Sequence, residues 1–390
     1  MGVALKGLAW DHRRCWGPLD AGVGDYLANH PEIDSITWDR RSLYEFGEGR
    51  LDLAVQDYDL VIYDHPFVGE IARDGLMLPF DPYLSAADAR AYEADSVGAS
   101  WRSYQAEGKQ WGLPIDAAAQ VAAYRPDLLR TYTDRPPRTH DEVLDLGRNV
   151  RADNRWLVLP LVPTDAICLI LTGAAMAGKP VRLADGVGLD SEVAEAVVDR
   201  FRAIAALSHP DSWSLNPISC CEHMIRNDDV VYTPFAFGYV NYTSRTETPH
   251  LLFADIPSTP PVGALLGGAG VGVSAFSKNP DAAAAYALHL FDPEVQRGVY
   301  VREGGQPGSL SAWTDPEANR LTRDFFADTL ATLQGAYLRD TMPGFIPAFR
   351  EGTHKAVAAI RGDLSARELV DWFNAAADRL GPVSLDRSVA

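Results

Sequence analysis

Two short segments of this chain end in the same pair of reactive side chains. Asp11 and His12 follow one predicted strand, and Asp64 and His65 follow another. Histidine titrates near neutral pH and a carboxylate can fix its tautomer, so His12 and His65 could act as general acid and base. The four side chains could equally hold a divalent metal ion. The plainer alternative is that one member of each pair caps a helix or a turn.

The elements around these pairs alternate between strand and helix. We expect strands over residues 3–10, 36–39 and 60–63, and helices over residues 18–29 and 51–56 between them. Such alternation predicts a parallel sheet built from right-handed crossovers. Because ligands bind at the carboxyl ends of the strands in such a sheet, both Asp-His pairs would reach one crevice if the first and third strands are neighbours.

The residues that close the first two strands add to this candidate crevice. Trp10 directly precedes the first Asp-His pair, and the second strand ends in a similar run that contains Trp38, Asp39 and Arg41. Three strands that end in aromatic and charged side chains indicate a polar wall that a ligand could contact.

The composition disfavours two classes of partner. The 390 residues include 53 acidic and 35 basic side chains, which gives a formal net charge of −18. Nucleic acid and anionic membrane surfaces both favour a basic face, so we expect neither as a partner. Residues 156–178 are apolar but are interrupted by prolines, and we expect a buried strand and a core helix there, with no membrane insertion.

The four cysteines favour buried thiols over a disulfide framework or a metal site. Cys15 and Cys168 stand alone, while Cys220 and Cys221 are adjacent, and disulfide geometry strains so short a loop. The run CCEH that ends at His223 offers several potential metal ligands. Neighbouring residues in regular structure cannot all point at one ion, and no second cluster is apparent, so we expect no metal and no other cofactor.

The first residues predict a strand and no leader peptide. Met1 to Trp10 is too short for a secretory signal and lacks its charged start and cleavage site. Cys15 follows two arginines, so the pattern of a lipoprotein anchor is missing as well. As written, the sequence favours the cytoplasm, and a periplasmic or extracellular location would require that a leader was trimmed.

A glycine-rich stretch late in the chain begins the most informative series of motifs. Residues 263–281 (GALLGGAGVGVSAFSKNPD) predict a buried strand that leads into a capped helix, and 291–296 (FDPEVQ) and 304–307 (GGQP) follow. Earlier segments are 113–120 (LPIDAAAQ) and 136–143 (PPRTHDEV). In this order and spacing they resemble the bacterial extracellular solute-binding proteins, the sugar- and oligosaccharide-capturing group that serves ABC importers.

The resemblance covers nearly the whole chain and implies its fold. We expect a two-lobed α/β protein of the type II periplasmic-binding-protein class, in which each lobe has a mainly parallel sheet flanked by helices. The chain would cross the hinge between the lobes three times. The implied first lobe comprises residues 1–112 and 257–309, and the second comprises residues 113–256 with the C-terminal helices of 310–390.

The resemblance also implies a function that requires no chemistry. The lobes would close on a small polar ligand, such as a carbohydrate, a polyol or a related organic molecule, and an ABC permease would be the partner if the protein is exported. It further implies ligand-facing residues beyond the strand ends. These are Asp116, Gln120, Tyr239, Asn241, Tyr242, Gly268 and Gln306.

A cytoplasmic enzyme or sensor on the same fold is the alternative function. A leaderless receptor would have no extracellular solute to capture. In that case His12 and His65 would be the catalytic residues, or would bind a divalent metal together with Asp11 and Asp64. The solute-binding function is the preferred prediction.

Overall fold

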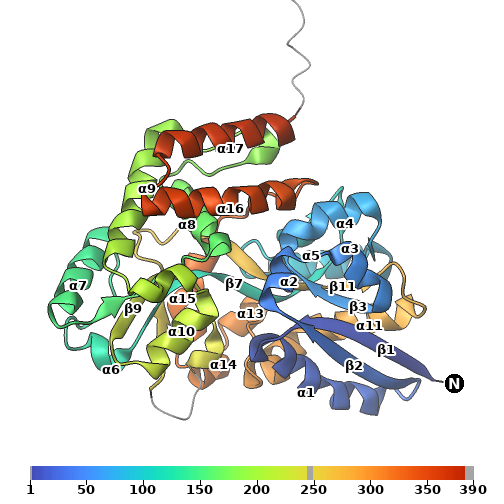
Figure 1. The fold of residues 1–390 in the computed structure, drawn as a ribbon. Helices are drawn as coiled ribbons and strands as arrows, with labels where there is room; N and C mark the ends of the chain where they lie inside the picture. Colours follow the sequence, from blue (N-terminus) through green and yellow to red (C-terminus); the bar gives the residue numbers. More distant parts are fainter. Residues whose placement is uncertain (1, 244–248, 383–390) are drawn as a thin grey trace, which may run out of the picture.

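The computed structural model describes residues 2–243 and 249–382, which form two lobes that lie side by side (Figure 1). A mixed nine-stranded sheet runs through both lobes in the order β2-β1-β3-β11-β7-β9-β8, with β4 paired to β11 and β10 paired to β7. The strands of the first lobe and the long strand β7 meet at the middle of the molecule (Figure 1). The two-lobed α/β fold is therefore confirmed.

The strands of this sheet lie at widely separated positions in the chain. They are β1 (Val3–Trp10), β2 (Ile33–Arg41), β3 (Leu60–Tyr63), β4 (Met77–Leu78), β7 (Leu113–Tyr124), β8 (Trp156–Leu157), β9 (Val230–Phe237), β10 (Leu252–Ala254) and β11 (Leu266–Ser274). A separate hairpin consists of β5 (Gln105–Ala106) and β6 (Lys109–Gln110).

Helices flank the sheet in both lobes. Those that pack around the first lobe are α1 (Arg13–Asn29), α2 (Leu43–Glu48), α3 (Leu51–Ala54), α4 (Val68–Asp74), α5 (Ala86–Ala94), α11 (Pro280–Phe291) and α12 (Pro293–Val295). The others are α6 (Pro126–Leu129), α7 (His140–Ala152), α8 (Pro163–Met176), α9 (Ser191–Ala206), α10 (Pro217–Arg226), α13 (Leu310–Trp313), α14 (Pro316–Leu321), α15 (Phe325–Gln334), α16 (Phe345–Arg361) and α17 (Ala366–Leu380).

The strand directions differ from the prediction of a mainly parallel sheet in each lobe. β1 is parallel to β2 and β3, so the first and third strands are neighbours as expected. β11 is antiparallel to β3 and to β7, and β7 is antiparallel to β9 and β10. The chain leaves the first lobe along β7 and returns along β11, so the two connecting strands must run in opposite directions.

Most elements near the candidate crevice lie close to their predicted positions. The strands over residues 3–10 and 60–63 match β1 and β3, whereas the second strand is longer than predicted. The first helix begins at Arg13, well before the predicted start, because the His12 side chain accepts a hydrogen bond from the Arg14 N–H and caps it. Pro18 therefore lies inside the helix, one turn after its start.

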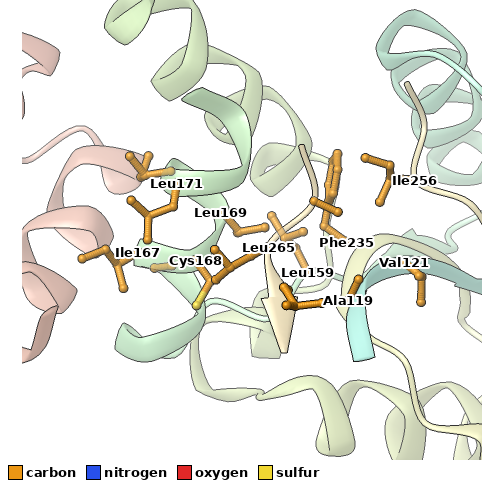
Figure 2. Packing of buried hydrophobic residues seen from close by; sticks show 14 of the residues in the cluster. Ala119, Val121, Leu159, Ile167, Cys168, Leu169, Leu171, Phe235, Ile256 and Leu265 are labelled. Atoms are coloured by element: carbon orange, nitrogen blue, oxygen red, sulfur yellow. The ribbon is translucent and has the colours of Figure 1, made fainter. Parts of the chain in front are cut away.

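Two clusters of buried hydrophobic side chains stabilise the fold. One covers the face of the first-lobe sheet that packs on α1 and α11. The larger cluster fills the second lobe and continues beneath the opposite face of the first-lobe sheet. Figure 2 shows its centre, where Cys168 and Leu169 of α8 lie on the side of Leu265, whereas Ile167 points to the opposite side of the helix.

The apolar stretch predicted as a core helix is such a helix. α8 has a continuous run of buried residues from Asp165 to Ala174, and α16 packs along it. All four cysteines are buried free thiols, as predicted. Among the described residues, no helix combines the length and the apolar character that crossing a bilayer requires.

Candidate functional site

A cavity of about 220 Å³ lies between the two lobes. It is bounded by the ends of β1 and β9, by α2, and by the first turns of α8 and α10. Its aromatic lining residues are Trp10, Tyr44, Phe46, Phe237 and Tyr239. Its charged and polar lining residues are Arg14, Glu48, Asp64, Thr164, Asp165, Asn216 and Arg339.

The aromatic lining comes from both lobes. In the first lobe, Trp10 at the end of β1 packs on Phe46 of α2 with ring centroids 4.8 Å apart. In the second lobe, Phe237 ends β9, and Tyr239 lies beneath the Arg14 guanidinium, 4.7 Å from it. Tyr44 is 68% exposed and stands at the cavity edge. A ligand in the cavity would therefore meet aromatic rings on two sides.

Glycines allow the chain to pass close behind this lining. A Cβ at Gly267 would lie 2.7 Å from the Phe237 ring, so glycine leaves room for the ring against β11. Gly268 has φ +122°, and a Cβ there would lie 2.4 Å from the carbonyl oxygen of Asp116. Both positions require glycine because β11 and β7 approach closely at the junction of the lobes.

An ion pair between Arg14 and Asp116 supports the cavity lining from behind. Arg14 donates from Nε and Nη2 to the two carboxylate oxygens at 2.8 and 2.5 Å, and from Nη1 to the Gly238 carbonyl at 2.8 Å. Burial disfavours the charge of Arg14, but the attraction of Asp116 outweighs it and raises the pKa of Arg14. The pair links α1, β7 and the segment after β9.

Asp64 and Arg339 form a second ion pair at the cavity. The Arg339 Nη2 donates to Asp64 Oδ2 at 2.8 Å, and the His65 Nδ1 lies 3.1 Å from Asp64 Oδ1. Burial opposes the charge of Asp64, but Arg339 and His65 together outweigh burial and lower the pKa of Asp64. Burial lowers the pKa of His65. Asp64 follows β3 and Arg339 lies between α15 and α16, so the pair joins segments from both lobes.

Direct contacts close one rim of the cavity. The Thr164 hydroxyl at the start of α8 donates to the Glu48 carboxylate at the end of α2. Arg350 of α16 donates to the backbone carbonyl of Glu48 and, at 3.4 Å, to that of Gly49. The lobes therefore touch through side chains at this rim, and the closed arrangement has hydrogen bonds of its own.

Asp165 brings an unusual carboxyl group to the cavity. It lies in the first turn of α8 and is only 6% exposed. Burial, with a smaller contribution from the negative charge of Glu48, raises the pKa of Asp165 to about 8. The side chain is therefore mostly protonated at pH 7 and can donate as well as accept a hydrogen bond.

A model of a known protein family matches most of the chain. Residues 47–323 match the family described as bacterial extracellular solute-binding protein. The chain belongs to this family. The resemblance inferred from the sequence motifs is thereby confirmed.

Solved structures share the fold of this solute-binding protein at low sequence identity. Maltose-bound MalE3 of T. maritima has 18% identity and a TM-score of 0.81, with 97% of this chain and 100% of that chain covered. The GacH receptor of Streptomyces glaucescens has 15% identity and a TM-score of 0.78, covering 97% and 98%. A solute-binding protein of Agrobacterium radiobacter K84 in complex with ribitol has 14% identity and a TM-score of 0.74, covering 97% and 99%.

Four of the predicted ligand-facing residues line the cavity of the solute-binding protein. They are Trp10, Asp64, Tyr239 and Gly268. Trp10 and Asp64 were predicted from their positions at strand ends, and Tyr239 and Gly268 were implied by the family resemblance. Whether these residues contact a ligand remains a prediction.

The two Asp-His pairs do not form one constellation. Asp11 is exposed, and the His12 ring caps α1 while its edge faces Tyr239 at a centroid distance of 4.7 Å. His65 is completely buried beside Asp64. The cavity lining contains Asp64 of these four residues and no histidine. The geometry therefore favours the capping alternative for His12 and gives the acid–base and metal-site hypotheses no support.

The end of the second strand lies outside the cavity. Trp38 packs against the buried cluster beneath the first lobe. Asp39 is exposed and pairs with Lys6 at 2.8 Å. Arg41 donates to the Ile62 carbonyl at 2.8 Å. The predicted wall is incomplete because β2 is the edge strand, and although it ends at the same sheet edge as β1, these three side chains do not line the cavity.

Five other predicted residues support the junction between the lobes and do not line the cavity. Asp116 binds Arg14, and Gln120 accepts a hydrogen bond from Thr172. Gln306 is fully buried, accepts from the Val240 N–H at 2.9 Å and donates to the Ala117 carbonyl at 3.0 Å. The remaining two are Asn241, which donates to the Gly304 carbonyl at 3.0 Å, and the buried Tyr242.

Several lining residues were missed by the sequence reasoning. Arg14 and Glu48 follow strand ends by a few residues, but only the tertiary structure turns them inward. Arg339 is distant from every motif. Asp165 carried a usable signal, because a carboxyl group inside an otherwise apolar helical stretch is uncommon without a polar partner or a functional reason.

Proposed function

We propose that this protein captures a neutral carbohydrate or polyol between its lobes. The observation that carries the proposal is an interlobe cavity lined by aromatic rings and hydrogen-bonding side chains from both lobes. Sugars have apolar C–H faces and rims of hydroxyl groups. They are therefore held by aromatic rings together with acceptors and donors that pair with each hydroxyl.

The cavity lining contains both aromatic rings and hydrogen-bonding side chains. Tyr44 and Phe237 present rings from opposite lobes. The polar lining adds the acceptor Glu48, the amide of Asn216 and the protonated carboxyl of Asp165. A site built for hydroxyl groups discriminates strongly against analogues that lack them, because its polar groups are then left unpaired.

The charge balance of the lining supports a neutral ligand. Arg14 and Arg339 bring two positive charges, and each is paired with a carboxylate. Asp165 is mostly neutral at pH 7 because of its raised pKa. Glu48 accepts from Thr164 at the rim. Among the described lining residues, no positive group is therefore left uncompensated for a carboxylate or phosphate, and an anionic ligand would lose hydration without gaining a partner.

Binding would proceed by closure of the lobes. A ligand that contacts both lobes binds the closed form better than the open form and shifts the equilibrium between them. The contacts of Glu48 with Thr164 and Arg350 already join the lobes at one rim.

Family membership supports delivery of the ligand to an ABC permease. The family is one of extracellular solute-binding proteins, so we place this protein outside the cytoplasmic membrane. The neutral sugars and polyols bound by the proteins of similar fold, maltose and ribitol among them, lie within the proposed ligand class.

A ligand screen tests the proposal. The shift of the unfolding temperature is measured with neutral sugars and polyols, from ribitol to maltose and longer maltooligosaccharides, and with gluconate and glucuronate as anionic counterparts. Hits are titrated by calorimetry. We expect binding of neutral compounds only, and a preference for the anions would overturn the charge argument.

Two matched variants locate the binding site. Tyr44→Ala removes an exposed ring at the cavity, whereas Phe276→Ala removes a 53% exposed ring that does not line it. We expect the first to weaken binding at least tenfold without a change in stability, and the second to bind as the wild type. Equal affinity of the two variants would place the ligand elsewhere.

A further inference from the structure

A second cluster of potential ligands lies in the second lobe, at the opposite end of β9 from the cavity. His209 precedes a short 3₁₀ turn (Pro210–Ser214), His223 lies on α10, and Asp229 directly precedes β9. Asp211 lies in the first turn after His209. Three separate segments therefore converge at this point, and none of the four residues lines the interlobe cavity.

The side chains of this cluster are close enough to share one ion. The rings of His209 and His223 lie with centroids 4.6 Å apart. Asp229 lies 3.6 Å from the Nε2 of each ring, through a different oxygen in each case. Asp211 lies 3.6 Å from His209 Nδ1. One ligand atom each from His209, Asp211 and His223 can be chosen so that all three lie within 4.8 Å of one another.

These spacings are too long for a hydrogen-bonded network and are close to those of donor atoms that share a metal ion. A separation of 3.6 Å is too long for an N–H···O hydrogen bond. Metal–ligand bonds of about 2.0–2.2 Å in a tetrahedral zinc site place neighbouring donor atoms about 3.4 Å apart. An ion between these groups would need only a small inward movement of the side chains.

Two atoms of the cluster have unmet hydrogen-bonding capacity. Nε2 of His223 and Oδ1 of Asp229 are buried and have no hydrogen-bond partner among the described residues. Leaving a buried polar atom unpaired is costly, and such atoms in a native protein point to an ion or an ordered water. Here the two unpaired atoms face each other across 3.6 Å.

The surroundings fix the orientation of the His209 ring. The Asp211 N–H donates to His209 Nδ1 at 3.2 Å, and an ion bound at this nitrogen would take the place of that hydrogen bond. Trp156 packs against His209 with an edge contact at 5.6 Å. Metal ligation requires a neutral histidine, and a preset ring orientation reduces the entropy cost of binding.

We propose that His209, Asp211 and His223 bind a divalent transition-metal ion of the zinc class, with Asp229 beside both rings to complete or orient the site. Two imidazoles with carboxylates suit Zn²⁺ and its neighbours better than Ca²⁺ or Mg²⁺, which prefer oxygen ligands alone. Cys220 and Cys221 take no part, since both are fully buried within the hydrophobic cluster.

The ion would stabilise the second lobe. It would tie α10 to the 3₁₀ turn and to the start of β9. The N-cap residue Asn216 and the first residue of α10, Pro217, line the interlobe cavity. The ion would therefore fix the helix that carries part of the cavity wall, at a distance from any ligand held there.

Zinc chloride titration of the chelator-treated full chain tests this proposal. We expect one ion per chain by calorimetry and by elemental analysis, together with a rise in unfolding temperature. Cobalt(II) in place of zinc should give the visible absorption of a four-coordinate N/O site. No binding at micromolar concentrations, or binding only of Mg²⁺ and Ca²⁺, would overturn the proposal.

Variants locate the ion. His223→Gln and the more exposed Asp211→Asn should each weaken zinc binding at least tenfold, whereas His30→Gln, at an exposed ion pair with Glu32, should leave it unchanged. Asp211→Asn keeps the test valid if His223→Gln fails to fold. Wild-type affinity in Asp211→Asn and in any folded His223→Gln protein would place the ion elsewhere.

Discussion

Arg14 and Asp116 lie 102 residues apart in the sequence and form a buried, doubly hydrogen-bonded ion pair at the junction of the lobes. Because Arg14 also donates to the Gly238 carbonyl, one guanidinium joins the start of α1, the shared strand β7 and the end of β9. The family resemblance implied that Asp116 faces the ligand. In the structure its carboxylate is fully engaged by Arg14, and the arginine faces the cavity instead.

Asp116→Asn should be strongly destabilising. The variant leaves the buried Arg14 without its countercharge, and loss of one partner of a buried pair costs about 3–5 kcal/mol. Chemical denaturation at pH 7 measures the change in free energy of unfolding. The matched control is Arg40→Gln, which breaks an exposed pair with Asp20 at the same 2.8 Å separation and should cost less than about 1 kcal/mol. Similar costs for the two variants would contradict the assigned importance of burial.

In the absence of ligand, the stability of Asp165→Asn relative to the wild type should increase as the pH rises. The folded protein holds the Asp165 proton up to a pKa of about 8, whereas the unfolded chain releases it near 3.9. Between these values the folded state binds the additional proton, so wild-type stability falls with rising pH by at most about 1.4 kcal/mol per unit. Unfolding free energies of both proteins at pH 5, 6.5 and 8 measure this. A difference that stays constant would show that Asp165 titrates normally.

His12 should make the stability of the folded protein decrease as the pH falls, which is opposite to the effect of Asp165. Burial, together with the positive charge of Arg14, lowers the pKa of His12 to about 4, whereas an unfolded histidine titrates near 6.5. The unfolded state therefore gains the proton first as the pH falls from 6.5 to 4, and the folded state is progressively destabilised. His12→Asn keeps an acceptor for the Arg14 N–H but removes the titration.

The His12 prediction is tested by comparing wild type and His12→Asn at pH 4.5 and 7.5. We expect the variant to gain stability relative to the wild type at pH 4.5 only. Equal differences at the two pH values would indicate a normal pKa for His12. In the wild type the effects of His12 and Asp165 partly cancel between pH 4 and 6.5, so single variants are needed to separate them.

Thr164→Val should favour the open form of the protein. The substitution removes the hydroxyl that donates to Glu48 across the cleft. A hydrogen bond to a charged group contributes about 1.5–3 kcal/mol, enough to shift the equilibrium between open and closed forms about tenfold or more. Small-angle scattering of the ligand-free protein should show a larger radius of gyration, and ligand affinity should fall.

Thr314→Val is the matched control for this change. Thr314 follows α13, is exposed, and its hydroxyl bonds only to backbone carbonyls within its own turn. Its radius of gyration should equal that of the wild type. An unchanged radius for Thr164→Val would mean that the rim contact does not hold the lobes together.

The sequence predicts the fold better than the site for a physical reason. The alternation of apolar strands and helices, and the order of the motifs from residue 113 to 307, are local patterns that can be read directly from the sequence. Ligand contact depends instead on where side chains point after two lobes have met. Trp10 and Asp64 were found because strand ends in a parallel sheet share one edge, whereas Glu48 and Arg339 reach the cavity only through packing.

Two histidines show the same limit of prediction from sequence. His12 was a candidate catalytic residue because it follows Asp11. In the structure its ring caps the start of α1, which is a structural role. His223 looked irrelevant because the residues next to it in sequence cannot converge on one ion. Its real neighbours, His209 and Asp229, come from other segments and are brought together only by the packing of α10 on β9.

The place of β11 in the sheet has a consequence for synthesis of the chain. This strand lies between β3 and β7, yet it is encoded some 200 residues after β3. Until residue 274 has left the ribosome, the emerging first lobe exposes the unpaired edge of β3, a template for wrong strand pairing. Completion of this lobe must therefore wait for most of the second one, and cellular yield should depend on protection of that edge during translation.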